Sequence, residues 1–440
     1  FDENDPRRTS LQTSSPKTKA GRRTIPLPPK LKEVLAVLDS QEALPMLWRA
    51  SLSDDANERQ QFIAAAEHCH AHNVRFPNSL DEVQMLQSLG DSAFARYLLG
   101  CFWYSKRRYD EAVSCWRETL EKSPDYAPAH RLLGVYSWNK QQDATQALAY
   151  LQRAVALEPD NARFLFELDF LQKLLARPVH ERLTTLVERK AVVLKRDDLT
   201  AELLSLWNAS GHYADAAAIL DTRVFHPWEG GEGKITGQYL LNQLHRALQF
   251  IERGAFKQAT DCLKAALRYP DNLGEGRLPG QTDNDIWYLL GYCAEQAGDA
   301  QQAAEYYQLA RQGGSTLDAG RYYNDQPADY LFWQGIALRK SGNPAQAEQH
   351  FRHFIDWAAQ HRDDVPQVDF FAVSLPDLVV LDVSAQQRHL QHCLFIEALG
   401  HLGLGNVSAC QQRMQQLLQI NPAHDKAHLI RHALQSGIFS

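Results

Sequence analysis

The sequence predicts an all-α fold: a right-handed superhelix, or α-solenoid, of about seven to nine helix pairs with long loop insertions. Three observations lead to this prediction. Apolar residues recur at helical spacing from Leu31 onward, in stretches such as LKEVLAVL and RQQFIAAAEHCHAH. A pattern of small and large residues then returns with a period of about 34 positions, the length of one helix–turn–helix unit. Glycine-rich polar stretches interrupt this pattern at four places in the second half, and helices do not tolerate such glycine density.

The repeat first appears between Ala95 and Pro159. Two consecutive units carry the tetratricopeptide pattern, with Leu99-Gly100, Ala112, Trp116 and Pro124 followed by Leu133-Gly134, Ala147, Leu151, Ala154 and Pro159. Two short antiparallel helices need a small residue where they cross closely, which explains Gly100. A large residue fills the groove beside it, which explains Trp116. A single helix pair cannot cover its own apolar face, so neighbouring pairs must stack. We therefore predict a tetratricopeptide-type right-handed superhelix.

Further units follow in the second half. Their small and groove-filling positions hold Ala216, Ala259, Gly291, Ala303, Tyr307, Gly335, Ala347 and Phe351, and the last unit ends at Pro422. Residues 162–198 keep a helical period but match the pattern weakly, so we expect an irregular join there. We predict a linker or disordered arm at 1–30, N-terminal helical repeats at 31–198, and C-terminal tetratricopeptide repeats with polar insertions at 199–440. The tail HDKAHLIRHALQS is predicted to form a capping helix.

Composition limits the class of function. The 440 residues are 44 % hydrophobic and 22 % charged, which is typical of soluble globular proteins. A net charge of −7 and a pI of about 6.2 argue against a nucleic-acid partner. No apolar run reaches the roughly 18 residues that a membrane helix needs, because Pro376 and Asp377 break the nearest one. The seven Cys form no CxxC pair, so we expect reduced core thiols in a cytoplasmic protein.

We expect no cofactor and no metal. His68, Cys69, His70 and His72 look like a metal cluster, but on a helix positions 68, 70 and 72 point in different directions. The stretches GGEG and GEG neither follow a strand nor carry the Lys-Ser/Thr of a phosphate-binding loop. No Ser-His-Asp or Cys-His set is recognisable by motif.

The four insertions carry side chains that binding sites use. They lie at 225–234, 272–284, 320–327 and 361–377. The candidate catalytic carboxylates are Glu229, Glu232, Glu275 and Asp325. The candidate ligand-binding residues are His226, Trp228, Lys234, Arg277, Asp283, Asn284, Tyr322, Tyr323, Asn324 and Asp369. Because equivalent junctions fall along one edge of a superhelix, these loops could converge on one pocket.

Acidic pairs and aromatic rings suit a carbohydrate site. Trp and Tyr faces stack on pyranose rings, and two carboxylates at the right separation act as acid and base. The same residues also have structural interpretations. Glu229 and Glu232 could be solvated loop charges or helix N-caps, and Asp325 could cap a helix that starts at Pro327. Trp228 and the Tyr322-Tyr323 pair could pack the loops onto the scaffold.

Taken together, FHPWEGG, NLGEGRL, YYNDQPAD and DFFAVSLPDL resemble the C-terminal part of a large bacterial family, over roughly residues 90 to 440. In that family a β-sandwich domain, similar to galactose-mutarotase-like modules, precedes the helical repeats. The resemblance implies carbohydrate as a ligand class and the β-sandwich as a neighbour. This sequence has no strand-rich segment and begins with Phe1, so we expect a processed chain or a piece of a longer protein, with the sandwich attached through the N-terminal linker.

Two functional hypotheses follow. The first is a non-enzymatic scaffold or interaction module that docks a peptide, the β-sandwich domain of the same protein, or a second copy in a homo-oligomer. The second is a carbohydrate-binding or glycoside-hydrolysing protein whose site is built from the four loops. Whether the chain is an enzyme stays open, and the non-enzymatic reading is favoured. Peptide recognition predicts a groove lined by the first helices of the pairs, whereas a sugar site predicts two loop carboxylates about 5–10 Å apart.

Overall fold

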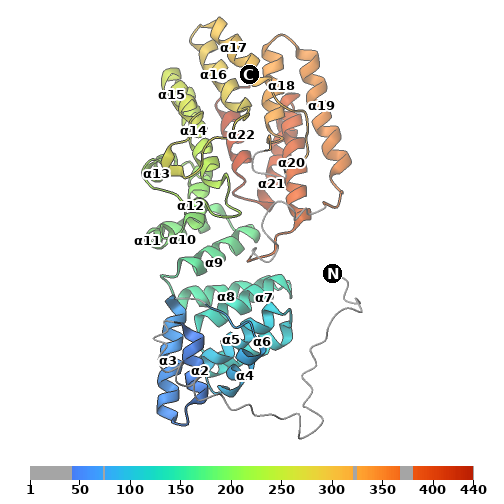
Figure 1. The fold of residues 1–440 in the computed structure, drawn as a ribbon. Helices are drawn as coiled ribbons and strands as arrows, with labels where there is room; N and C mark the ends of the chain where they lie inside the picture. The colour runs from blue at the N-terminus through green and yellow to red at the C-terminus, as the bar shows by residue number, and fades with distance from the viewer. Residues whose placement is uncertain (1–41, 73–74, 321–324, 367–379, 440) are drawn as a thin grey trace. The chain divides into compact units, whose positions relative to one another are not determined.

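The computed structural model describes residues 42–72, 75–320, 325–366 and 380–439 (Figure 1). Within these ranges the chain forms the α-helices α2 to α22 and one short 3-10 helix, and no strand. The described part is therefore all-α, as predicted. The chain divides into two compact units, residues 1–129 and 130–440.

The first unit is built from short helical hairpins. Its described helices are α2 (Ala43–Leu52), α3 (Ala56–His72), α4 (Leu80–Ser88), α5 (Ala93–Ser105) and α6 (Tyr109–Lys122), and α7 (Ala127–Asn139) starts here. α2 packs on α3, and α5 pairs with α6. α4 begins with a capping box, in which the Ser79 side chain accepts from Glu82 N and the Glu82 side chain accepts from the Ser79 backbone.

The second unit continues the pairs. Its helices up to the first insertion are α8 (Ala144–Leu157), α9 (Ala162–Leu174), α10 (Val179–Glu188), α11 (Lys190–Val193), α12 (Asp197–Ala209) and α13 (Tyr213–Leu220). After it come α14 (Lys234–Glu252), α15 (Phe256–Ala266), the 3-10 helix η2 (Asp271–Leu273), α16 (Asn284–Gln296), α17 (Ala300–Ala310), α18 (Tyr330–Lys340), α19 (Pro344–His361), α20 (Ala385–Gly403), α21 (Val407–Ile420) and α22 (Asp425–Gln435). The four insertions join the second helix of one pair to the first helix of the next, as expected.

The small residues of the repeat do what their spacing predicts. A Cβ added at Gly100 of α5 would lie 2.4 Å from the indole nitrogen of Trp116 in α6, and one at Gly291 of α16 would lie 2.6 Å from the ring of Tyr307 in α17. Trp116 is fully buried, and Tyr307 is 5 % exposed. Only glycine lets each aromatic ring fill the groove of the facing helix, so the backbones can approach closely.

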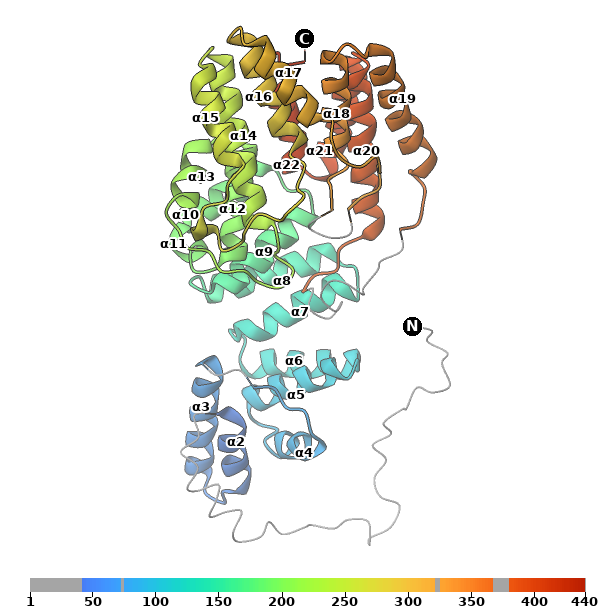
Figure 2. The same ribbon diagram turned by 45° about the horizontal axis from the view of Figure 1, so that its top comes forward.

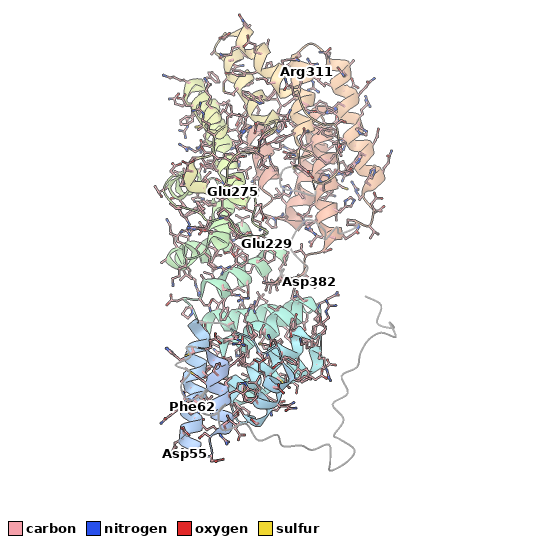
Figure 3. The ribbon with its side chains drawn as sticks, viewed as in Figure 1. Asp55, Phe62, Glu229, Glu275, Arg311 and Asp382 are labelled. Atoms are coloured by element: carbon pink, nitrogen blue, oxygen red, sulfur yellow. The ribbon has the colours of Figure 1, made fainter. Side chains whose placement is uncertain are left out.

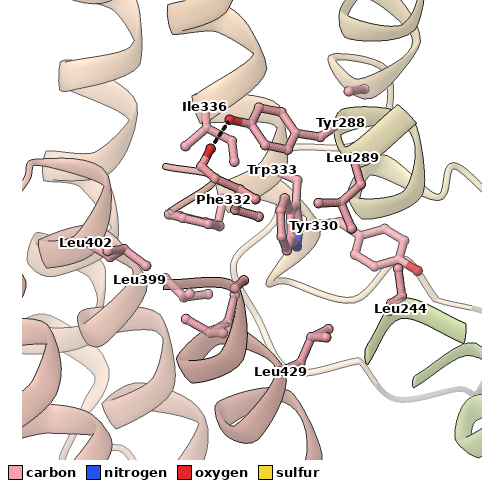
Figure 4. Close-up of a cluster of buried hydrophobic side chains, with 14 of the residues drawn as sticks. Leu244, Tyr288, Leu289, Tyr330, Phe332, Trp333, Ile336, Leu399, Leu402 and Leu429 are labelled. Carbon is pink, nitrogen blue, oxygen red and sulfur yellow. Dashed lines mark hydrogen bonds between the residues drawn. The ribbon is translucent and has the colours of Figure 1, made fainter. Parts of the chain in front are cut away.

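In the second unit the first helices of successive pairs form an inner row. α12 packs on α14, α16 on α18, and α18 on α20. Figures 1 and 2 show α22 inside this row, with α14 and α16 on one side and α18 and α20 on the other. The core continues from the row onto α22, because Leu429 of α22 lies among Leu244, Tyr330 and Leu399 (Figure 4).

Three expectations differ from this arrangement or are not settled by it: the tail, the arm at 1–30 and the boundary near residue 198. The tail is helical as predicted, but it does not simply cover the last pair, because α22 packs on α12 and α14 of the inner row. The expected arm at 1–30 lies outside the described residues. The expected boundary near residue 198 falls within the second unit, next to the short helix α11, and the division into three regions stays a prediction.

Candidate functional site

α22 lies along the first helices of several successive pairs. It packs on α12 and α14, and single side chains connect it to α16 and to the start of α18. We call the side chains that contact α22 or the two residues after Gly437 the inner face: Ser205, Tyr213, Gln238, His245, Glu252, Asp285, Tyr288, Asp329 and Tyr330. Helical repeats that recognise peptides bind them on a surface of this kind. We therefore take the inner face as the candidate functional site.

At the start of α22, the inner face holds a carboxylate. Ser205 Oγ donates a hydrogen bond to one oxygen of Asp425, and Gln238 Nε2 donates to the other, both at 2.7 Å. Burial raises the pKa of Asp425, and the Ser205 hydrogen bond, the charge of Lys173 and the Gln238 hydrogen bond offset part of that effect. Two fixed donors from two different helices therefore select an acidic group at this position.

The next residue of α22 supplies the opposite charge. Lys426 Nζ lies 3.3 Å from Asp329 Oδ2 and 3.8 Å from Asp285 Oδ2, and 5.2 Å from the centroid of the Tyr330 ring. Burial alone would lower the pKa of Lys426, but Asp329 and Asp285 outweigh it and raise that pKa above its usual value. Burial raises the pKa of Asp285. Removing Lys426 would leave two carboxylates together in a poorly hydrated place, which is costly.

Histidines form the other end of the contact. His432 Nδ1 of α22 lies 2.9 Å from His245 Nδ1 of α14 and 3.3 Å from the hydroxyl of Tyr213. His432 Nε2 lies 3.3 Å from a carboxylate oxygen of Glu252. Burial lowers the pKa of His245 well below its usual value, and it also lowers that of His432 although Glu252 opposes the change. An open pocket of about 270 Å³ lies beside these rings, with Arg431 in its wall.

The apolar side of α22 and the residues after it complete the contact. The buried residues of this side are Ala427, Leu429, Ile430, Ala433 and Ile438. Tyr288 Oη donates to Ile438 O at 3.0 Å, and the ring of Phe439 lies edge-on to Phe332 and tilted against Trp333. α22 is therefore an amphipathic helix held by charge at its start, by apolar packing along its length and by histidines near its end.

The loops that carry the candidate sugar residues are tied to their neighbours. Phe225 N donates to Asn272 O at 2.7 Å, and Asn272 Nδ2 donates to Leu220 O at 2.8 Å and to Arg223 O at 2.7 Å. Arg223 also pairs with Asp197 at the start of α12, at 2.6 Å. The structure thus brings the first and second insertions together into one ordered layer.

Glu275 connects these two insertions at the start of α14. Its carboxylate oxygens accept from Gly233 N at 3.1 and 3.0 Å, and Thr236 Oγ1 lies 3.4 Å from one of them. Figure 3 labels Glu275 and, in the first insertion, Glu229. Unpaired backbone N–H groups at a helix N-terminus attract anions, so this contact stabilises α14. The catalytic role that the sequence suggested for Glu275 stays a prediction.

The other candidate residues of the first insertion differ in how far they are exposed to solvent. The solvent side carries His226, Glu229 and Lys234. Glu232 is half-buried, and the indole of half-buried Trp228 lies so close to Gly231 that a Cβ there would be 2.0 Å from the ring. Trp228 thus packs against its own loop, while Glu229 lies exposed one residue further on.

Three candidates of the second insertion fasten it to the scaffold. Asp283 is 1 % exposed and forms an ion pair with Arg277, and its backbone adopts a left-handed φ of 45° just before α16. Asn284 Nδ2 donates to Ala310 O at 2.8 Å and to Gln312 O at 2.6 Å, which joins α16 to the end of α17. These contacts place all three side chains in structural positions, and their part in ligand binding stays a prediction.

Several candidates of the third and fourth insertions cannot be placed in this way. Tyr322, Tyr323, Asn324 and Asp369 lie outside the described residues, and Asp325 is exposed. The segment between the fourth insertion and α20 contacts α7: Asn139 Nδ2 donates to Val380 O, and Asp382 N donates to Asn139 Oδ1, both at 2.8 Å. The described contacts therefore join neighbouring segments, and convergence of all four loops stays a prediction.

The inner face was not among the sequence-based candidates. Its polar members Ser205, Gln238, His245, Asp285 and Asp329 are each less than a tenth exposed. A signal was present, because these polar residues sit at buried helical positions beside leucines, as in LLSLW and GQYLLNQLHRAL. Buried polar side chains need partners, so their occurrence on the first helices could have pointed to this surface.

Comparison with known proteins agrees with this architecture. A family model described as the tetratricopeptide repeat matches residues 104–162 and 244–320. The paired all-α architecture and this match show that the chain contains tetratricopeptide repeats. Such modules generally serve as protein–protein interaction scaffolds.

Three solved structures are similar to parts of the chain at low identity. PilW, a widely conserved type IV pilus biogenesis factor, is 16 % identical over 49 % of this chain and 90 % of that chain, with a TM-score of 0.27. The Naa15/Naa10 complex bound to HypK-THB gives 13 % identity over 88 % of this chain and 55 % of that chain, with a TM-score of 0.37. The apo form of the quorum sensor NprR from B. thuringiensis gives 12 % identity over 86 % and 97 % of the two chains, with a TM-score of 0.32.

Two further findings concern the described residues. No group of three or more His, Cys, Asp or Glu side chains in the described part could hold a metal ion. Of the helices placed in the structure, none has the length and apolar character needed to cross a bilayer.

Proposed function

We propose that this protein is an interaction scaffold that binds a helical segment of a protein partner on the inner face. One observation carries the proposal: the inner face already holds α22, an amphipathic helix of 11 residues. A row of first helices that accommodates one such helix has the width and the side-chain pattern for another. This is the helix-in-groove mode of recognition, in which spaced apolar anchors provide affinity and polar pairs fix the register.

The partner segment should carry an acidic residue followed by a basic one. Ser205 and Gln238 offer two donors at the position of the first, and Asp285 and Asp329 offer two carboxylates at the position of the second. The segment could come from the β-sandwich domain that the family resemblance suggests, from a separate protein or from a second copy. Complementary charges at fixed positions suppress wrong partners more than they raise affinity.

The test is a display screen of helical peptides against the intact chain. Bound peptides should contain the acid–base pair, and Gln238→Glu should weaken their binding by about tenfold or more, because it removes a donor and adds a carboxylate that repels the partner's acidic residue. Lys257→Glu on the exposed side of α15 is the matched control and should leave binding unchanged. Peptides that lose affinity with the control and not with Gln238→Glu would place recognition elsewhere, and the proposal would fail.

A carbohydrate function is the second candidate, and one observation favours it. The first two insertions form a hydrogen-bonded layer that presents exposed Glu229 next to half-buried Trp228. Such a layer is preorganised for a rigid polar ligand. A glycan array with the intact protein and a Glu229→Gln variant tests it. Signals that are absent, or equal for the two proteins, would remove Glu229 from consideration as a catalytic or binding carboxylate.

A further inference from the structure

We infer that α22 is a displaceable internal ligand: it occupies the inner face until an amphipathic helix of the same chemistry, carried by a partner protein, replaces it. The inference rests on the proposed function and adds the class of ligand and its regulation. α22 covers the inner face. The chain with α22 in place therefore binds its partner more weakly than a chain with a free inner face would.

The first argument is the polarity of the surface that α22 covers. A helix that is a permanent part of the core is normally met by apolar side chains, because every buried polar group must find a partner. Besides apolar residues such as Leu244, α22 is met by a hydroxyl, an amide, an imidazole and two carboxylates: Ser205, Gln238, His245, Asp285 and Asp329. These residues tolerate water when α22 leaves. An all-leucine surface in their place would aggregate when it opened.

The second argument is electrostatic. Asp285 and Asp329 share one cation, Lys426, which comes from α22. When α22 leaves, the two carboxylates must be hydrated or meet another cation. A basic residue on an incoming helix satisfies this requirement, and a neutral one does not. Because Asp425 next to Lys426 meets donors and not carboxylates, the ligand must present its two charges in this order.

The third argument is the packing at the histidine end. The rings of His245 and His432 meet beside an open pocket of about 270 Å³, so this part of the contact is incompletely filled. The pocket is open to solvent, and His428, Arg431 and His432 of α22 form part of its wall. A ligand with a larger side chain at this position would fill the pocket and bind more tightly than α22 does.

The connectivity allows displacement. Four residues, 421–424, join α21 to α22, and α22 is not the second helix of any repeat pair. The repeat pairs α14/α15, α16/α17 and α20/α21 pack through their own facing sides. α22 can therefore leave as a unit without breaking a pair, as expected of a local opening that costs less than global unfolding.

The experiment uses the intact chain and a fluorescent peptide of residues 421–439. Lys426→Glu in the chain should release α22, and amide hydrogen exchange over residues 425–435 should accelerate about tenfold or more relative to the unmodified chain. The peptide should then bind this variant about tenfold or more tightly than it binds the unmodified chain. A peptide that itself carries Lys426→Glu should not bind. Gln415→Ala, at an exposed position of the neighbouring helix α21, is the control and should change neither readout.

A second, milder variant tests whether the result depends on misfolding of the first. Asp329→Asn removes one of the two carboxylates from the inner face and should accelerate exchange of α22 less than Lys426→Glu does, with circular dichroism unchanged. If α22 exchanges as slowly as α20 in all these chains, it is a permanent core helix and the inference is wrong. If α22 opens and the peptide still does not bind, the inference is wrong about the ligand. Binding of another helix to the inner face while α22 stays protected would refute the inference and leave the proposed function standing.

Discussion

The imidazoles of His245 and His432 face each other with their Nδ1 atoms 2.9 Å apart. One of the two nitrogens must carry the hydrogen and the other must accept it, so the contact requires at least one neutral ring. A proton added to the acceptor removes the hydrogen bond and brings two N–H groups face to face. The pairing between α14 and α22 therefore depends on the protonation state of two buried histidines.

Acidification should loosen α22. Burial holds the pKa values of His245 and His432 below the usual value of about 6.5, so these rings take up protons more readily once they are exposed. The stability that they contribute is present above about pH 6.5 and is lost as the pH falls toward their folded-state pKa values. Glu252 of α14 opposes the lowering of the His432 pKa. On α22, His428 lowers the pKa of His245 further, and Arg431 lowers that of His428. Burial raises the pKa of Tyr213 of α13, so its hydroxyl stays neutral.

Urea titrations at pH 7.5 and 5.5 measure this effect. The free energy of unfolding should fall by an amount on the order of 1–3 kcal/mol, and His432→Asn should show a smaller fall because one of the titrating rings is gone. His353→Asn, at an exposed position of α19, is the control and should keep the full pH dependence. A stability that rises on acidification would contradict the prediction.

Gly291→Ala should destabilise the pair α16/α17. The added methyl would lie 2.6 Å from the Tyr307 ring, which is 5 % exposed and has little room to move. Overpacking of this kind costs about 1–3 kcal/mol. Gly237→Ala in α14 is the matched control, because nothing lies within 4 Å of its Cβ position. Alanine should raise helix stability there by about 0.5–1 kcal/mol, and thermal denaturation distinguishes the two outcomes.

The pair Gly291 and Tyr307 also shows what could be predicted from the sequence. Close crossing of two helices imposes a small residue and a large one at fixed spacing, and that requirement repeats in every unit. The helix pairs and the places of the four insertions were therefore predictable. The position of α22 was not, because Lys426 contacts residues 97 and 141 positions earlier in the chain. No local periodicity encodes a contact between a tail and the inner side of an array.

The loops with the candidate sugar residues show a second limit of prediction from sequence. Glycine density and polar residues correctly identified the loops, and the side chains of Glu275 and Asn284 do make specific contacts. Those contacts are made to backbone groups that the folded scaffold leaves unpaired, such as Gly233 N at the start of α14. Sequence shows which side chains are capable of binding, but the three-dimensional arrangement decides whether backbone or ligand uses them.

Arg182 should prove essential to the irregular region that precedes α12. Its guanidinium is 1 % exposed and lies 2.7 Å from Asp169 and 3.0 Å from Glu202. Burial alone would raise the pKa of Glu202, but Lys173 and Arg182 lower it to about 2. Arg182→Ala would leave two carboxylates buried without this partner, and the free energy of unfolding should fall by about 3–5 kcal/mol.

The comparison for Arg182 is an exposed pair on α19. Arg352 and Glu348 lie 2.5 Å apart with side chains that are 64 % and 53 % exposed. Arg352→Ala should change stability by no more than about 0.5 kcal/mol, because water solvates both charges when the pair is broken. The double variant Asp169→Leu/Arg182→Met should recover part of the lost stability. Equal losses for Arg182→Ala and Arg352→Ala, measured by urea unfolding, would contradict the prediction.

Glu275→Gln separates a structural role from a catalytic one. The glutamine keeps the shape of the side chain but removes the charge that faces Gly233 N and the start of α14. Loss of a charged acceptor at a helix N-terminus costs about 1 kcal/mol. Glu229→Gln is the matched change at an exposed position of the neighbouring insertion and should leave the melting temperature unchanged. If Glu275→Gln is instead as stable as the unmodified chain and abolishes a glycan signal, Glu275 serves a ligand, and its contact with Gly233 contributes little to holding α14.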